Sequence, residues 1–299
     1  MSNSDLYQSW LMRYAERKNQ EAKLPPAPVA PVVQPDPNAG VVSPVPTGVI
    51  TFKSAFLLKG QFGKDFLQEY NARVKRDYAD ASALKVLNWD DSGKVVTGSN
   101  PFAVILANQI LNPMKIRTAT QGELEAILNQ GGIEFKNHYE ESSLVWRTDA
   151  DPNEYLAKNI SGQLRRHNPK LKNNSAYVIP LNALSLKKDS NSPHKLAFVL
   201  NNPDLCFEAP ILMSKNGSYI DSAKMNPQTG LPSQIYSTDP NGKNRQLWTI
   251  NSGLSRLYLY GVLDVSSNYE DLAYSGSGGQ VVCVSGEATV PKKFGVGAP

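Results

Sequence analysis

The segment from Pro25 to Pro46 constrains this chain more than any other feature, because eight of its 22 residues are proline. Proline lacks a backbone N–H and is excluded from helix interiors and central strands. The residues between the prolines are mainly valine and alanine, which is typical of an extended spacer without a core. We therefore predict a linker at residues 24–48, with a ligand motif for a proline-binding module as the alternative. A globular region is expected from residue 49.

The first 23 residues have the pattern of a short amphipathic helix. Leu6, Trp10 and Tyr14 recur every four residues, and Ser4 is suited to cap the helix. Such a helix is too short to be stable alone in water. We therefore expect residues 1–23 to dock on a partner surface. That surface is either a virion or cell-surface anchor or the chain's own globular region.

The apolar content of the chain bears on localisation. Residues 1–10 lack the basic and then apolar pattern of a secretory signal. No stretch is long and apolar enough to cross a bilayer. We expect a protein with no signal peptide and no membrane span, which reaches a virion or cell surface by a non-classical route.

Charge and residue spacing narrow the functional classes. The net charge of +4 is small for 299 residues, and the densest basic spots, Arg165-Arg166 and Lys187-Lys188, are short. They are typical of a solvated surface, with phosphate binding as the minor alternative, so we expect no nucleic-acid partner. The three histidines lie far apart in the sequence, which predicts no metal site. We expect no cofactor and no catalytic residue.

Residues 49–112 form the first part of the globular region. A helix is expected over residues 64–80, because Phe66, Tyr70 and Val74 recur every four residues on one face. An apolar run follows at residues 102–111. The sequence assigns this part of the chain no function of its own.

Residues 113–287 show clearer local signals. Thr120 and Glu123 fit a capping box that opens a helix ended by Gly131. Asp151, which precedes a proline, is predicted to cap a second helix that ends near His167. Strand-like runs follow at residues 177–181, 196–200, 246–250 and 280–285. Two helices followed by short antiparallel strands and long loops predict the α+β class.

The segment from Trp248 to Glu287 has a specific pattern. A strand with a tryptophan is followed by a loop rich in Tyr, Ser and Gly, and the run from Gly279 to Val284 closes it. This segment resembles the variable region of target proteins of diversity-generating retroelements, especially those of archaea and their viruses. The resemblance implies a C-type-lectin-like domain at residues 113–287 with a variable region at 254–285. Residues 1–112 have no counterpart, and residues 288–299 form a tail.

In that family, adenine-directed mutagenesis rewrites selected asparagine codons so that varied ligands are recognised. Changes in the first two bases of such codons give Tyr, Asp, Ser, Gly or Val but never Lys, Gln, Glu, Trp or Met. Between Leu257 and Gly279 only Glu270 belongs to the types that these codon changes cannot produce. Average usage would place about four residues of those types in a segment of this length. We expect Glu270 to be a fixed position. The twelve candidate ligand-binding residues are Tyr258, Tyr260, Gly261, Val262, Asp264, Ser266, Asn268, Tyr269, Asp271, Tyr274, Gly276 and Gly278.

The composition of the candidate residues is typical of antibody paratopes. Leu257, Leu259 and Leu263 lie between them and are expected to be buried, with the four tyrosines exposed on one face. We therefore expect a non-enzymatic protein that binds another protein or surface ligand. The alternative is a structural virion or adhesin component without a ligand of its own.

An enzyme hypothesis remains because formylglycine-generating enzymes share the lectin-like fold. Those enzymes work through an accessible pair of cysteines. The two cysteines of this chain, Cys206 and Cys283, lie in apolar surroundings in the sequence. The sequence therefore favours binding over oxidase chemistry.

Overall fold

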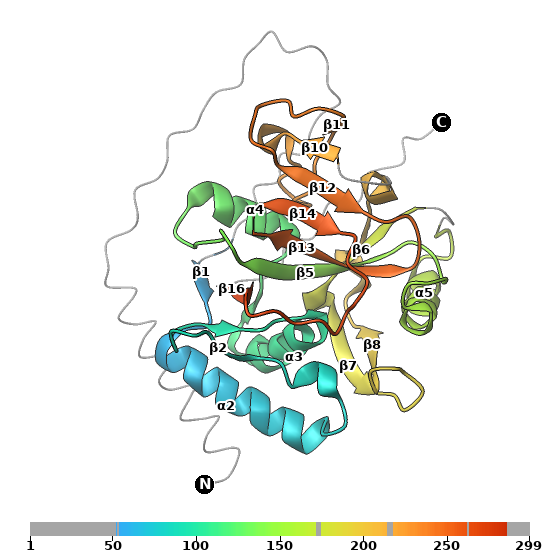
Figure 1. Cartoon of the computed structure of the whole chain (residues 1–299). Coiled ribbons are helices and arrows are strands. Elements are labelled where there is room, and N and C mark those ends of the chain that lie inside the picture. The colour runs from blue at the N-terminus through green and yellow to red at the C-terminus, as the bar shows by residue number, and fades with distance from the viewer. Residues whose placement is uncertain (1–51, 53, 172–174, 214–217, 262, 286–299) are drawn as a thin grey trace. The chain divides into compact units, whose positions relative to one another are not determined.

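The computed structural model describes residue 52 and residues 54–285, except for 172–174, 214–217 and 262. The predicted docking helix, the proline-rich linker and the tail lie outside the described residues. The described residues belong to one compact unit. The described part is a mixed α+β structure with four α-helices and a curled sheet (Figure 1), which confirms the predicted class.

The helices and strands have the following bounds. The α-helices are α2 (Gly60–Asp77), α3 (Pro101–Leu111), α4 (Gln121–Gln130) and α5 (Glu154–His167). The strands are β1 (Ser54–Leu57), β2 (Asn88–Trp89), β3 (Val96–Thr97), β4 (Ile116–Thr118), β5 (Tyr139–Trp146), β6 (Tyr177–Pro180), β7 (Leu184–Lys188), β8 (Leu196–Leu200), β9 (Phe207–Glu208), β10 (Ser218–Ile220), β11 (Ile235–Tyr236), β12 (Gln246–Thr249), β13 (Leu254–Tyr260), β14 (Asp264–Ser267), β15 (Gly279–Gln280) and β16 (Val282–Ser285). Within the described residues, no helix has the length and apolar content needed to cross a membrane.

The main sheet has nine strands, eight of them in the order β11-β10-β12-β14-β13-β5-β6-β9, and β15 pairs with β5 beside this path. Most neighbours are antiparallel. However, β12 pairs with β14 in parallel, and β15 pairs with β5 in parallel. These two pairs correct the expectation of antiparallel strands alone. The register between β5 and β13 shifts at Leu257/Tyr258, a bulge that adds one residue to β5.

A second sheet joins the first part of the globular region to its last strand. Its order is β1-β16-β4, and β1 runs antiparallel to β16 with Ser54 opposite Ser285. Two small sheets, β2-β3 and β7-β8, lie with α2 and α3 below the main sheet in the view of Figure 1. Residues 54–111 are therefore built into the same unit as the C-terminal strands.

Helix α2 begins four residues before the predicted start and ends at Asp77. Phe66, Tyr70 and Val74 are buried, as the spacing predicted. Phe62 lies one turn earlier on the same face and is also buried. The apolar face therefore extends the helix beyond the predicted boundary.

The two predicted helix starts have different outcomes. Thr120 and Glu123 form the capping box of α4, as expected, and Gly131 follows the helix with a left-handed φ of 74°. The prediction that Asp151 caps α5 is wrong, because Asn153 occupies the cap position. The side-chain amide of Asn153 donates to the carbonyls of Leu254 and Glu270 at 2.8 and 2.6 Å. These tertiary contacts determine the helix start in place of a local cap.

The side chains of β13 point alternately to the core and to the opposite face of the sheet. Leu257 packs in one core cluster with Leu247 and Val265. Leu259 packs in a second cluster, which contains Val284 of β16 and residues of α4. Both leucines are fully buried. Because successive side chains of a strand point to opposite faces, Arg256, Tyr258 and Tyr260 face the other side.

Candidate ligand-binding site

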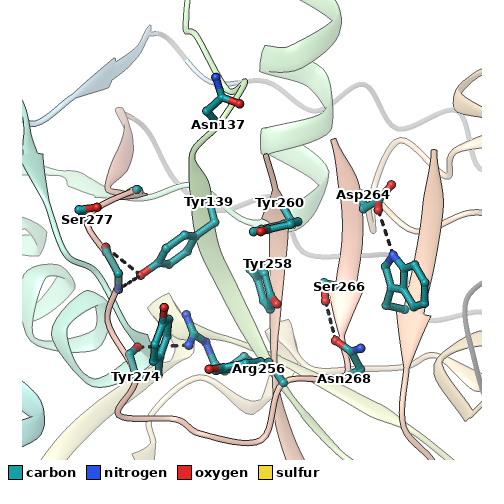
Figure 2. A pocket seen from close by; sticks show the side chains of 14 residues that line it. Asn137, Tyr139, Arg256, Tyr258, Tyr260, Asp264, Ser266, Asn268, Tyr274 and Ser277 are labelled. Atoms are coloured by element: carbon teal, nitrogen blue, oxygen red, sulfur yellow. Dashed lines mark hydrogen bonds between the residues drawn. The ribbon is translucent and has the colours of Figure 1, made fainter. Parts of the chain in front are cut away.

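A hollow of about 740 Å³ lies over the outer face of β13 and β14 (Figure 2). Strands β5 and β12 and the loop between β14 and β15 complete its lining. The lining residues are Asn137, Tyr139, Trp248, Arg256, Tyr258, Tyr260, Asp264, Ser266, Asn268, Tyr269, Tyr274, Gly276, Ser277 and Gly278. Segments distant in the sequence thus meet at one surface.

Aromatic side chains dominate the hollow. Trp248, Tyr260, Tyr269 and Tyr274 are four of the five large hydrophobic side chains that are exposed in the described part of the chain. Tyr260 stands perpendicular to the half-buried Tyr258, with an interplanar angle of 88°. Tyr269 and Tyr274 meet edge to face at 5.2 Å between ring centroids. We call Tyr260, Tyr269 and Tyr274 the exposed tyrosines.

A buried arginine lies beneath these rings. Arg256 is 2% exposed and pairs with Glu141, whose carboxylate accepts from Nη2. The Cζ atom of Arg256 lies 5.2–6.0 Å from four ring centroids, those of Tyr139, Tyr258, Tyr269 and Tyr274. Burial lowers the pKa of Arg256, and the surrounding tyrosines oppose that shift. The ion pair and the cation–π contacts hold rings from three segments around one cation.

Asp264 fixes the opposite edge of the hollow. Its Oδ1 accepts from the backbone N–H of Gln246 at 2.7 Å, and its Oδ2 accepts from Nε1 of Trp248 at 2.9 Å. Burial raises the pKa of Asp264, whereas the hydrogen bond from Trp248 lowers it. The indole ring is thereby oriented along the rim. Next to it, Ser266 and Asn268 are joined by a side-chain hydrogen bond of 2.8 Å.

The structure brings nine of the twelve predicted site residues together. Gly261 is buried in the turn after β13, close to Asn137, and Asp271 is exposed but does not line the hollow. Val262 lies outside the described residues. The nine that line the hollow are Tyr258, Tyr260, Asp264, Ser266, Asn268, Tyr269, Tyr274, Gly276 and Gly278.

Asp271 has a different position from the predicted one because its carboxylate turns back on the loop. Its Oδ1 accepts from the backbone N–H groups of Ala273 and Tyr274 at 2.9 and 3.0 Å. This is a side-chain turn of the kind that aspartate commonly forms. Asp271 therefore shapes the loop rather than the surface of the hollow.

The expected separation of tyrosines from leucines is present, with two differences. Leu257 and Leu259 are fully buried, and the exposed tyrosines lie on the opposite face. Tyr258 is half-buried under its neighbours, and burial raises its pKa. Leu263 is only partly buried, because it lies in the turn between β13 and β14 with a left-handed φ of 71°.

Five residues of the lining were not among the predicted ones. Trp248 marked the start of the resembling segment, so the sequence contained a signal for it. Nothing in the sequence singles out Arg256 or Ser277. Tyr139 begins β5 and Asn137 precedes it, more than 100 residues before the variable region, and only the pairing of β5 with β13 brings them to the hollow.

The hollow has few charged groups. Among its lining residues only Arg256 and Asp264 are charged, and both are engaged by neighbours. Across the described residues, no group of three or more His, Cys, Asp or Glu side chains is placed to hold a metal ion. The rings offer contact area, and amides and hydroxyls offer hydrogen bonds.

The two cysteines are free and lie away from the hollow. Burial raises the pKa of Cys206 to about 12. Cys283 is fully buried in β16, as its sequence context predicted, and burial raises its pKa as well. Thiolate is the reactive form of cysteine, so both positions disfavour nucleophilic chemistry.

Comparisons with protein-family models, with curated proteins and with solved structures give no match for this chain. The class of the molecule therefore rests on its own geometry: an α+β unit with an aromatic hollow on one sheet face.

Proposed function

We propose that this protein is a non-enzymatic ligand-binding protein and that the aromatic hollow is its binding surface. Among the described residues, four of the five exposed large aromatic side chains cluster over one hollow, and this supports the proposal most strongly. Large aromatic groups are enriched at interface hot spots, because they bury much area at low conformational cost. A hollow of about 740 Å³ has the size of a typical ligand cleft.

We further propose a C-type-lectin-like fold for residues 113–287 and diversification of the hollow by a retroelement. Nine of the twelve candidate positions line the same hollow, and β13 keeps its leucines in the core. Such an arrangement lets surface residues change while the scaffold stays constant. The protein would display this surface on a virion or a cell, attached through residues 1–23.

A binding screen tests the proposal. The full chain is applied to arrays of purified surface proteins and surface polysaccharides, beside a variant with the exposed tyrosines replaced by serine. A matched control replaces Tyr155, Tyr219 and Tyr236, which lie outside the hollow, by serine. Saturable binding that is lost in the first variant and retained in the control supports the proposal. Binding that both variants retain would contradict it.

The diversification proposal has a separate test in the encoding genome. We expect a reverse-transcriptase gene nearby and a near-copy of the coding segment for residues 254–285. The two copies should differ at adenines of the template. A genome without either feature would contradict the retroelement proposal. The binding proposal would still be tested by the array.

A further inference from the structure

The hollow has one wall that belongs to neither β13 nor β14. This wall is the loop at residues 268–278, between β14 and β15, which we call the wall loop. It supplies Tyr269 and Tyr274 to the hollow and contains several small residues. Asp271 fixes one turn within the loop.

The main chain of the wall loop is held by groups outside it. Nη1 of Arg256 donates to the carbonyls of Asp271 and Tyr274 at 3.3 and 3.2 Å. Backbone N–H groups and the side chains of Asn100 and Asn153 reach other carbonyls of the loop. The loop residues whose carbonyls accept from outside the loop include Tyr269, Glu270, Asp271, Ala273, Tyr274 and Gly278.

Much of this support comes from the turn at residues 98–100, between β3 and α3. The side-chain amide of Asn100 donates to the carbonyl of Ala273 at 3.0 Å. The hydroxyl of Ser275 donates to the carbonyl of Gly98 at 2.6 Å. The N–H of Ser99 donates to the carbonyl of Gly279, the first residue of β15, at 3.1 Å. The turn and the loop are therefore joined by one side chain from each, and a main-chain hydrogen bond to β15 lies beside these contacts.

The hydroxyl of Tyr139 links the turn to the loop from the floor of the hollow. It donates to the carbonyl of Ser99 at 2.9 Å and accepts from the N–H of Gly276 at 2.7 Å. The approach is close, since a Cβ atom on Gly279 would lie 2.5 Å from that hydroxyl and 2.8 Å from the nitrogen of Ser99. Gly98 also requires glycine, because its φ is 84° and a Cβ atom would meet the Val86 carbonyl at 2.4 Å.

We propose that the turn at residues 98–100 is a positioning element of the ligand site and that Asn100 is its central residue. The inference rests on the proposed function of the hollow. The turn holds the wall loop at the carbonyl of Ala273 and at the hydroxyl of Ser275, so that Tyr269 and Tyr274 stay over the hollow. This gives residues 54–111, which lie outside the resembling segment, a role in recognition.

Asn100 is suited to this role because the oxygen and the nitrogen of its side-chain amide have different partners. Its Oδ1 accepts from the N–H of Ala103 at 2.8 Å and caps α3, while its Nδ2 reaches Ala83 and Ala273. The side chain is fully buried. Serine is also a good cap, so Asn100→Ser keeps the helix start and removes the contact with the loop.

Asn108 offers a matched control on the same helix. It is also fully buried, and it exchanges hydrogen bonds with Thr118 of β4 instead of the loop. Asn108→Ser therefore removes a comparable buried amide and leaves the wall loop untouched. Ser275→Ala removes a loop contact from the other side with little risk to folding.

Hydrogen exchange of the full-length chain, followed by mass spectrometry, tests the proposal without any ligand. We expect amides of residues 268–280 to exchange about three- to tenfold faster in Asn100→Ser and in Ser275→Ala, since that is the scale of one lost hydrogen bond. Amides of α5 should keep their rates. Asn108→Ser should leave the loop rates as in the parent chain.

Two results would overturn the proposal. One is an equal rise in loop exchange in Asn100→Ser and Asn108→Ser, which would show that Asn100 acts through general stability. The other is an unchanged loop in Ser275→Ala, and this result decides the matter if Asn100→Ser does not fold. Because no ligand is used, failure here is distinct from failure of the proposed function, which the array decides.

Discussion

Glu140 has the most unusual environment of any carboxyl group in the described structure. It lies in β5, is 1% exposed, and neither of its carboxylate oxygens has a hydrogen-bond partner among the described residues. Its register partners are Leu259 and Gln280, and the Oε1 atom of Gln280 also lacks a described partner. Burial raises the pKa of Glu140 from 4.5 to about 9, so the folded protein holds this group protonated at neutral pH.

The sign of the pH dependence follows from that shift. Below pH 4.5 the carboxyl is protonated in both the folded and the unfolded chain, so it adds no pH dependence. Between pH 4.5 and about 9 only the unfolded chain releases the proton, and the free energy of unfolding falls by about 1.4 kcal/mol per pH unit. Above about pH 9 the fall ends. At pH 7 the accumulated cost is about 3 kcal/mol.

Glu140→Gln should remove this cost. The amide is neutral at every pH, has nearly the same shape, and can donate to Oε1 of Gln280. We expect the variant to be more stable than the parent chain by up to about 3 kcal/mol at pH 7 and by almost nothing near pH 4.5. Urea unfolding, followed by tryptophan fluorescence at pH 5, 6, 7 and 8, measures the difference.

The control is Glu134→Gln, which changes an exposed carboxyl near the start of the same strand. It should leave the pH dependence of unfolding as in the parent chain. If the difference between Glu140→Gln and the parent is the same at pH 5 and pH 8, Glu140 is not a protonated buried acid, and the reasoning fails.

Three further predictions concern the site and the thiols. Replacing the exposed tyrosines by serine should change stability by no more than about 0.5 kcal/mol each, whereas Leu259→Ala should cost about 2–5 kcal/mol; equal losses in thermal melts would show that the rings belong to the core. Iodoacetamide at pH 7.5 should leave both cysteines of the native chain unmodified, because burial disfavours their thiolates; a fast-reacting thiol would revive the oxidase alternative. Glu141→Gln should cost about 3–5 kcal/mol in urea unfolding, because it leaves Arg256 buried without its counter-charge; a loss below about 1 kcal/mol would contradict that role.

Local signals in the sequence determined several helices and the alternation of β13. The capping box of Thr120 and Glu123 needs only four consecutive residues, and the period of Phe66, Tyr70 and Val74 needs only the geometry of a helix. These interactions form between near neighbours, so a single sequence contains the whole cause. The paratope-like composition of residues 258–278 likewise located most of the hollow.

Only the tertiary structure decided what lies beneath and behind that surface. Arg256 and Glu141 are 115 residues apart, and Asn100 and Ala273 are 173 apart. The side-chain amide of Asn153 donates to carbonyls of β13 and of the wall loop and does not cap its own helix. A buried polar group must find a partner, but nothing in its own neighbourhood of the sequence says which one. The partner is set by the strand order and register, which arise from the burial of the whole chain at once.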